Sequence, residues 1–190
     1  ALTSLLIYRD LCDSEERYRL IAENTADTIA LLDLNLNTIY VSPSVLKLRG
    51  YTVQEAMAQS LNQILTPKSL QKANELFAEQ MVLESNGKAD PSRTTLSEFE
   101  EYCKDGSTIW VELVASLLRD NNFKPTGILT ITRNITERKR AEMEIVRVNR
   151  TLRMLSDTNQ ALIYISDESA LLNEICRIAV EVGNYRMAWV

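Results

Sequence analysis

The pattern of hydrophobic and polar positions divides the first part of the chain into short strand-like runs separated by turn signals. Short runs rich in Val, Ile, Thr and aromatic residues, bounded by Gly, Pro, Asn or Asp, are typical of strands. Five runs of this kind occur, at residues 28–33, 38–42, 94–103, 108–118 and 128–135. The segment Lys104-Asp105-Gly106-Ser107 predicts a hairpin between the third and fourth runs, because Asp-Gly favours a tight turn.

Three short helices are predicted between the second and third strands. The first begins at Ser42-Pro43 and ends at Gly50, since Pro is favoured at the start of a helix and Gly at its end. Thr52 and Glu55 have the spacing of a capping box and begin the second helix. The third begins at Thr66-Pro67, and one face of it carries Leu70, Ala73, Leu76, Phe77, Gln80 and Met81. Helices grouped between two sets of strands indicate an α+β fold with an antiparallel sheet.

Helical patterns also occur at both ends of the chain. Residues 1–13 predict the end of an incoming linker helix, and Asp13 with Glu16 has capping-box spacing for the helix that follows. After Thr136 a heptad repeat predicts a parallel coiled-coil signalling helix over residues 137–160. The repeat positions are Ala141, Ile145, Val148, Leu152, Leu155, Asn159 and Leu162. Asn159 either sets the register of this coiled coil or marks the point where the helix enters another fold. Ser166 or Asp167 is expected to cap a further helix, and residues 185–190 are expected to form a strand.

Composition narrows the function classes. The 190 residues carry a formal net charge of −5, which argues against a nucleic-acid partner because no basic face dominates. The absence of histidine excludes His-ligated haem, most zinc sites and a phosphoacceptor histidine, and no metal site is expected. No apolar run approaches the roughly 20 residues of a membrane span, so no membrane segment is expected in this stretch. Three cysteines without metal-type spacing favour a reducing, cytoplasmic compartment.

Several short motifs follow one another in a recognisable order. They are Ser14-Glu15-Glu16-Arg17-Tyr18-Arg19, Tyr40-Val41-Ser42-Pro43-Ser44, Gly50-Tyr51-Thr52, Lys104-Asp105-Gly106-Ser107, Trp110-Val111-Glu112 and Asn134-Ile135-Thr136-Glu137-Arg138. In this order they resemble a PAS sensory domain with a PAC-type exit motif, over residues 14–136. Residues 161–190 are similar to the start of a GAF domain that is cut off by the end of the chain.

The PAS resemblance implies a five-stranded antiparallel sheet with short helices on one face, enclosing a pocket. An N-terminal helix and the long C-terminal coiled-coil helix are expected to flank it. The resemblance also implies a non-catalytic sensory input and dimerisation module of a bacterial-type multidomain signal transducer. A sensor histidine kinase of the two-component type and a cyclic-di-GMP enzyme are the two expected parents. The expected partners are a second copy, bound through the terminal helices, and a small-molecule ligand.

The exit motif of the resembling family is expected to transfer the signal. Its residues in this chain are Asn134, Ile135, Thr136 and Arg138. Where the family has Asp-Ile-Thr, this chain has Asn134, which can form hydrogen bonds but not the ion pair that Asp would make. Thr136 is expected to be the N-cap of the following helix.

The candidate pocket residues are mostly apolar side chains of the predicted strands and helices. They are Ile29, Leu31, Tyr40, Leu48, Tyr51, Leu65, Phe77, Met81, Phe99, Val111, Leu113, Leu129 and Ile131. Plain core is the favoured interpretation of these residues, and a ligand pocket is the other. Strand alternation places Glu101 on the same face as Phe99, so Glu101 either reaches a ligand or, as we favour, ends the strand in solvent. Trp110 lies on the opposite face from Val111, where dimer contact and simple exposure both stay open.

Two other functions compete with the sensory module. A non-covalent flavin-type redox or light sensor is the main alternative, and the sequence leaves the cofactor open. Covalent flavin is not expected, because no Asn-Cys-Arg motif surrounds any of the cysteines, which are Cys12, Cys103 and Cys176. A carboxylate-based enzyme is disfavoured, since alternation sends Glu98 and Glu100 to the opposite face from Glu101.

Overall fold

The computed structural model describes residues 25–85, 90 and 92–187. The chain falls into two compact units, of which the first runs to Thr136 and the second begins at Glu137. The helical segments predicted before residue 25 lie outside the described residues. None of the helices in the described ranges is long and apolar enough to cross a membrane.

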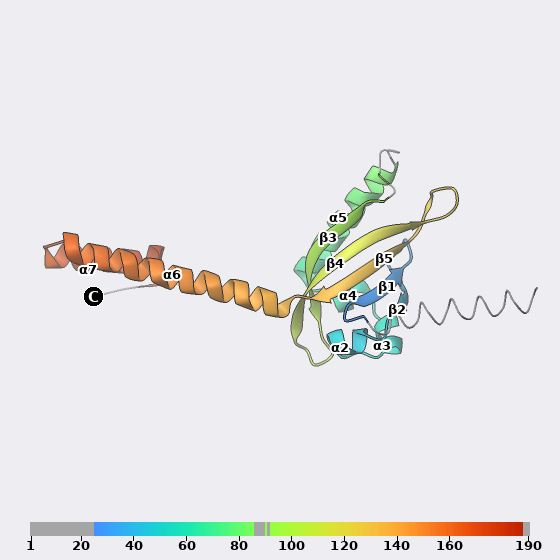
Figure 1. Ribbon diagram of the computed structural model, residues 1–190, viewed down its shortest axis with the longest axis horizontal. Helices are drawn as coiled ribbons and strands as arrows, with labels where there is room; N and C mark the ends of the chain where they lie inside the picture. The colour runs from blue at the N-terminus through green and yellow to red at the C-terminus, as the bar shows by residue number, and fades with distance from the viewer. Residues whose placement is uncertain (1–24, 86–89, 91, 188–190) are drawn as a thin grey trace, which may run out of the picture. The chain divides into compact units, whose positions relative to one another are not determined.

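The first unit is built on a five-stranded antiparallel sheet with the strand order β2-β1-β5-β4-β3 (Figure 1). The strands are β1 (Thr28–Leu32), β2 (Thr38–Val41), β3 (Thr94–Tyr102), β4 (Thr108–Arg119) and β5 (Pro125–Asn134). The last strand lies in the centre, between β1 and β4. The predicted α+β fold with an antiparallel sheet is therefore confirmed.

Four helices connect β2 to β3. They are α2 (Val45–Arg49), α3 (Val53–Met57), α4 (Leu61–Ile64) and α5 (Pro67–Ser85). Their side chains and those of all five strands line one common cavity, so the helices cover one face of the sheet. We call this the inner face.

Local capping explains where the short helices begin and end. The capping box of Thr52 and Glu55 is formed as predicted, with both reciprocal hydrogen bonds present. Gly50 ends α2 in the left-handed region, at a φ of 80°, where a residue without Cβ is favoured. Helix α4 was not predicted, although Ser60 and Gln63 have the same capping-box spacing as the pair that begins α3.

Two small hydrophobic clusters attach the helices near the two edges of the sheet. One contains Val41, Val45 and Ala56 and joins the edge strand β2 to α2 and α3. The other contains the three residues Leu65, Phe99 and Val111 and joins β3 and β4 to the segment before α5. Because the central strands β1 and β5 lie between these clusters, space remains above the middle of the sheet.

The second unit consists of α6 (Thr136–Tyr164) and α7 (Glu168–Glu181). A long helix after the last strand was predicted, and it is present. Asp167 caps α7 by accepting a hydrogen bond from Ala170 N–H at 2.8 Å, which decides between the two predicted caps. A strand was predicted over residues 185–190; the first three of these are not in a strand, and the others lie outside the described residues.

Candidate ligand cavity and exit junction

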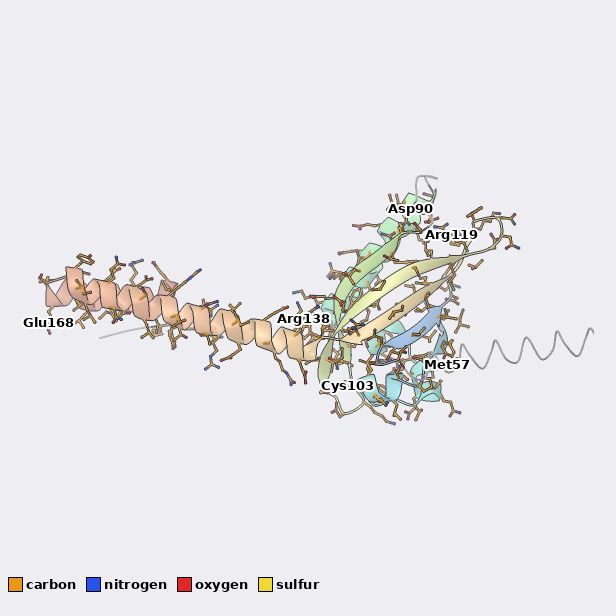
Figure 2. The ribbon with its side chains drawn as sticks, viewed as in Figure 1. Met57, Asp90, Cys103, Arg119, Arg138 and Glu168 are labelled. Atoms are coloured by element: carbon orange, nitrogen blue, oxygen red, sulfur yellow. The ribbon has the colours of Figure 1, made fainter. Side chains whose placement is uncertain are left out.

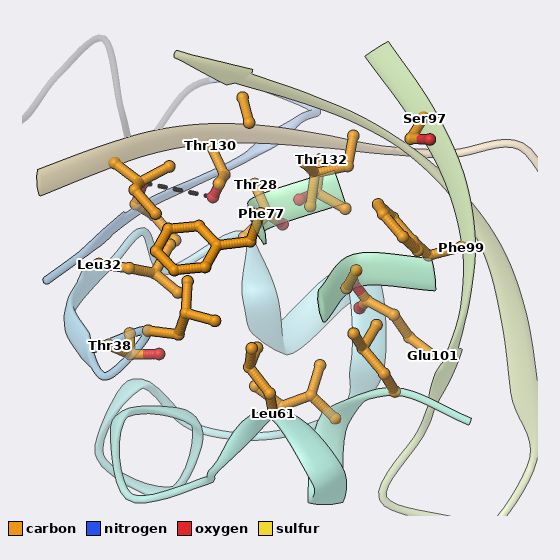
Figure 3. A pocket seen from close by; sticks show the side chains of 18 of the residues that line it. Thr28, Leu32, Thr38, Leu61, Phe77, Ser97, Phe99, Glu101, Thr130 and Thr132 are labelled. Atoms are coloured by element: carbon orange, nitrogen blue, oxygen red, sulfur yellow. Dashed lines mark hydrogen bonds between the residues drawn. The ribbon is translucent and has the colours of Figure 1, made fainter. Parts of the chain in front are cut away.

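A cavity of about 200 Å³ lies between the inner face of the sheet and helices α2, α3, α4 and α5 (Figure 3). Most of its lining is apolar. The lining includes five of the candidate pocket residues, namely Leu48, Leu65, Phe77, Phe99 and Leu113. Phe77 comes from α5 and Phe99 from β3, so the two rings approach the cavity from different layers.

The candidates on β1, β2 and β5 do not line the cavity, and here the predicted strand face was wrong. These residues are Ile29, Leu31, Tyr40, Leu129 and Ile131. β1 pairs with β5 so that Thr28 lies opposite Thr132 and Ala30 opposite Thr130, and these smaller residues line the cavity instead. Period-two alternation then sends the larger neighbours to the outer face.

The remaining three candidates lie outside the lining for different reasons. Val111 is fully buried in the cluster with Leu65 and Phe99. Tyr51 packs against the cluster of β2, α2 and α3. Met81 is half-buried on α5 and does not reach the cavity. Val111 and Tyr51 therefore belong to the hydrophobic core, which was the favoured interpretation of the candidate residues.

An ion pair between Arg49 and Glu101 is buried at one end of the cavity. Arg49 Nε lies 3.3 Å from Glu101 Oε2, and the two side chains are only 6% and 7% exposed. The expectation that Glu101 ends its strand in solvent was wrong, because Glu101 shares the inner face with Phe99. Burial raises the pKa of Glu101, and the positive charge of Arg49 opposes this rise in part.

Sequence reasoning missed Arg49, although a signal for it was present. Arg49 follows Val45 by four residues in α2, so both side chains share one face of the helix. Val45 is 1% exposed, and a charged residue on such a face must be buried with it. Strand alternation and helix periodicity together therefore bring a carboxylate and a guanidinium to the same place.

The exit from the sheet is held by hydrogen bonds to β4. Ile135 is buried, and its N–H donates to Trp110 O at 2.8 Å. Thr136 Oγ1 accepts a hydrogen bond from Trp110 N–H at 3.0 Å. Helix α6 begins at Thr136 itself, so the expectation that Thr136 is the N-cap is corrected. Asn134 Oδ1 instead accepts from Thr136 N–H at 2.9 Å.

Two charged residues flank this junction. Arg138 lies at the beginning of α6 (Figure 2) and is about half-exposed. Its Nε lies 3.7 Å from Glu142 Oε1. Arg133, near the end of β5, makes two hydrogen bonds of 2.9 and 2.7 Å to Asp27. The Arg133 guanidinium lowers the pKa of Asp27. This pair ties the last strand to the segment entering β1, and the long sequence separation left no local signal for it.

Comparison with known families agrees with this geometry. The family model that matches the chain describes a PAS domain and covers residues 26–137. The chain belongs to the PAS domain family. The matched region ends one residue beyond Thr136, so the PAS domain closes at the exit junction.

Two relatives of this PAS domain are histidine kinases. Sensor histidine kinase TmoS of Ectopseudomonas mendocina is 31% identical over 151 residues, which cover 76% of this chain and 15% of that protein. Methanogenesis regulatory histidine kinase FilI of Methanothrix harundinacea (strain 6Ac) is 22% identical over 184 residues, covering 95% of this chain and 19% of that protein. The chain thus spans less than a fifth of either relative.

Solved structures share the fold. The PAS domain of a protein from Colwellia psychrerythraea superimposes with a TM-score of 0.52 at 24% identity, covering 64% of this chain and 97% of that one. An RNA-binding light-oxygen-voltage receptor gives a TM-score of 0.55 at 15% identity, covering 71% of this chain and 37% of that one. At these identities the likeness concerns the fold alone.

Proposed function

We propose that this PAS domain is the non-catalytic input module of a sensor histidine kinase and that it responds to a small molecule bound in the cavity. The observation that carries the proposal is the cavity itself, a mostly apolar space of about 200 Å³ with a buried ion pair at one end. Packed protein interiors leave few voids larger than a water molecule. A space of this size beside buried polar groups suits a ligand.

The proposed relay from the cavity to the exit runs along β5. Thr130 and Thr132 line the cavity, and Asn134 ends the same strand beside the first residue of α6. A ligand that fits one position of β5 better than another biases the two by its difference in affinity. The hydrogen bonds of Ile135 and Thr136 to Trp110 would carry that bias into α6.

We further propose that α6 pairs with its counterpart in a second copy and leads into a GAF-like domain that starts near residue 161. The heptad positions Ile145, Leu152 and Leu155 are at least half-exposed in the single chain. A continuous apolar stripe of this kind is buried when two helices form a coiled coil. The compartment proposed for this assembly is the cytoplasm.

Two alternatives to this proposal remain. In the first, the full-length protein is a cyclic-di-GMP enzyme, and a different output domain follows the same exit from β5 into α6. A bound flavin is the other alternative, and the cavity volume favours something smaller, because a 150 Å³ cavity is filled by one benzene ring. An absorbance spectrum of freshly purified protein tests for the flavin directly.

The experiment replaces two neighbouring residues of β4 with the same side chain. Ala115 lines the cavity and Val114 lies on the outer face, so Ala115→Leu fills the cavity and Val114→Leu is the matched control. In the natural full-length protein, Ala115→Leu is expected to change autophosphorylation several-fold and abolish its response to small-molecule extracts. Equal output from the two variants would contradict a sensory role of the cavity.

A further inference from the structure

The cavity has a polar end and an apolar end, and the strand register defines them. Thr28 on β1 pairs with Thr132 on β5, and Glu101 on β3 lies further along in the same direction. At the other end, Leu32, Ile128 and Leu117 form an apolar row across the three middle strands. Thr38 pairs with Leu32 at one side of this row, and Arg93 precedes Thr94, the partner of Ser116, at the other. Figure 3 shows Glu101 and Leu32 on opposite sides of the cavity, with Thr28 between them. An occupant therefore needs one polar end and one apolar end.

Two hydrogen-bond donors at the polar end lack an acceptor. Among the described residues, Arg49 Nη1 and Thr28 Oγ1 are buried atoms without a hydrogen-bond partner, and both residues line the cavity. A guanidinium can only donate, and a threonine hydroxyl can donate as well as accept. Buried polar groups in native proteins are nearly always paired. The two donors together require an acceptor that the described protein atoms do not supply.

Neither Glu101 nor the second arginine of the lining changes this requirement. Glu101 meets Arg49 through Nε rather than Nη1, so this ion pair leaves Nη1 without an acceptor among the described residues. Arg93 also lines the cavity, but it donates to Glu84 at 2.8 Å and to Gln80 O at 3.2 Å. Arg49 is therefore the buried cation with capacity for a ligand.

The volume limits the size of the occupant. An engineered apolar cavity of about 150 Å³ binds benzene, so about 200 Å³ holds one ring, or an aliphatic chain of similar volume, together with a small polar group. A dicarboxylate would place a second charge against the apolar row, where the nearby cation, Arg93, is already paired with Glu84. One charged group and one compact hydrocarbon body fit both ends.

We propose that the cavity binds a small monocarboxylic acid with an apolar body, its carboxylate accepting hydrogen bonds from Arg49 and Thr28. This inference rests on the proposed sensory function and specifies the ligand of that same cavity. Arginine suits the role because its planar donors match a carboxylate. A carboxylate bound beside Glu101 would raise the pKa of Glu101 further, because a nearby like charge disfavours the ionised form. The hydrocarbon body lies against the apolar row.

Calorimetric titration of the chain with benzoate and with benzamide, its neutral counterpart of nearly equal shape, tests this inference. Benzoate is expected to bind at least about tenfold more tightly, because a hydrogen bond to a charged group is stronger than a neutral one. Arg49→Met is expected to weaken benzoate binding by about 10- to 100-fold. Thr28→Val, which keeps the β-branched shape, is expected to weaken it by about 2- to 12-fold.

Arg93→Met is the matched control, since it removes an arginine that lines the same cavity but already has partners. Its affinity for benzoate is expected to stay within about twofold of the unmodified chain. The double variant Arg49→Met, Glu101→Gln removes both buried charges and guards against an unfolding artefact. It is expected to bind benzamide but not benzoate.

The outcomes separate this inference from the proposed function. Benzamide binding equal to benzoate binding, or unchanged benzoate affinity in both Arg49→Met and Thr28→Val, overturns the monocarboxylate inference and leaves the sensory cavity standing. Failure of both compounds to bind overturns the inference as well, and the output experiment with Ala115→Leu then decides the sensory function independently.

Discussion

At the residue scale, buried hydroxyl groups hold the chain where β2 turns into α2. Ser42 is fully buried, and its Oγ accepts a hydrogen bond from Ile29 N–H at 2.9 Å. The Ser42 and Ser44 hydroxyl oxygens lie 2.6 Å apart, and Ser44 donates to Asp27 O at 3.1 Å. Small hydroxyl residues suit this place because they satisfy backbone groups of the entering strand while filling little space.

Also at the residue scale, Glu55 makes stability depend on pH. Lys104 donates to both carboxylate oxygens of Glu55, at 2.7 and 2.9 Å, and Thr52 N–H donates at 3.0 Å. The Lys104 ammonium and then the Thr52 N–H lower the pKa of Glu55 from 4.5 to about 2. Because the folded pKa is depressed, this stabilisation is fully present above about pH 4.5 and is lost as the pH falls to about 2.

The test compares urea unfolding of the chain with that of Glu55→Gln across this pH range. The stability difference between the two is expected to be constant near neutral pH and to shrink below about pH 4.5. It should also diminish in high salt, since the pair is exposed. Glu79→Gln, at an exposed position of α5, is the control. A difference that grows on acidification would contradict the assignment.

At the element scale, the exit junction joins β5 to α6 through β4. The pairing of Ile135 and Thr136 with Trp110 continues the β4–β5 ladder beyond the end of the strand. Asn134 supplies an acceptor for the first N–H of α6, which is one of the backbone donors that a helix leaves unsatisfied. The strand and the helix are thus joined without a flexible loop.

Two substitutions at this junction are expected to act in opposite directions. Thr136→Val keeps the shape but removes the acceptor of Trp110 N–H, which costs about 1 kcal/mol of unfolding free energy. Asn134→Asp keeps an acceptor and adds a negative charge near the start of α6, which stabilises by about 0.3–1 kcal/mol. Chemical denaturation followed by circular dichroism measures both, with exposed Thr126→Val of β5 as the control. Stabilisation by Thr136→Val would refute the described pairing.

At the scale of the whole molecule, each unit leaves one feature that calls for a partner. The first contains a cavity with two donors that no described residue pairs, and the second carries an exposed apolar stripe along α6. The stripe follows the heptad positions, whereas Met143 lies outside them and is also exposed. A ligand and a second copy are the partners that we propose for these two features.

Sedimentation velocity tests the proposed dimer. Leu152→Glu places a charge in the heptad stripe and is expected to weaken self-association by more than about tenfold, because a coiled-coil core position tolerates charge poorly. Met143→Glu is the matched control, since it replaces an exposed apolar residue of α6 that lies outside the stripe. A monomer at all accessible concentrations of the unmodified chain, or equal loss of dimer in both variants, would contradict the proposal.

Much of the fold followed from local signals. Turn residues and β-branched runs predicted all five strands, and capping residues predicted the start of α3 and, with two candidates, of α7. The candidate site was predicted less well. The cavity lining on α5 and β3 was foreseen through Phe77 and Phe99, whereas the face of β1 and β5 was reversed because these strands carry apolar residues on both faces.

By itself, the sequence determined the order of the elements, the antiparallel α+β class and the direct passage from the last strand into a helix. These depend on turn chemistry and periodicity, which are local properties of the chain. Only the tertiary structure decided which strand face lines the cavity and that Arg49 meets Glu101. The reason is physical: pairing between β1 and β5 and the packing of α2 join residues far apart in sequence, and their free energy exceeds any local preference.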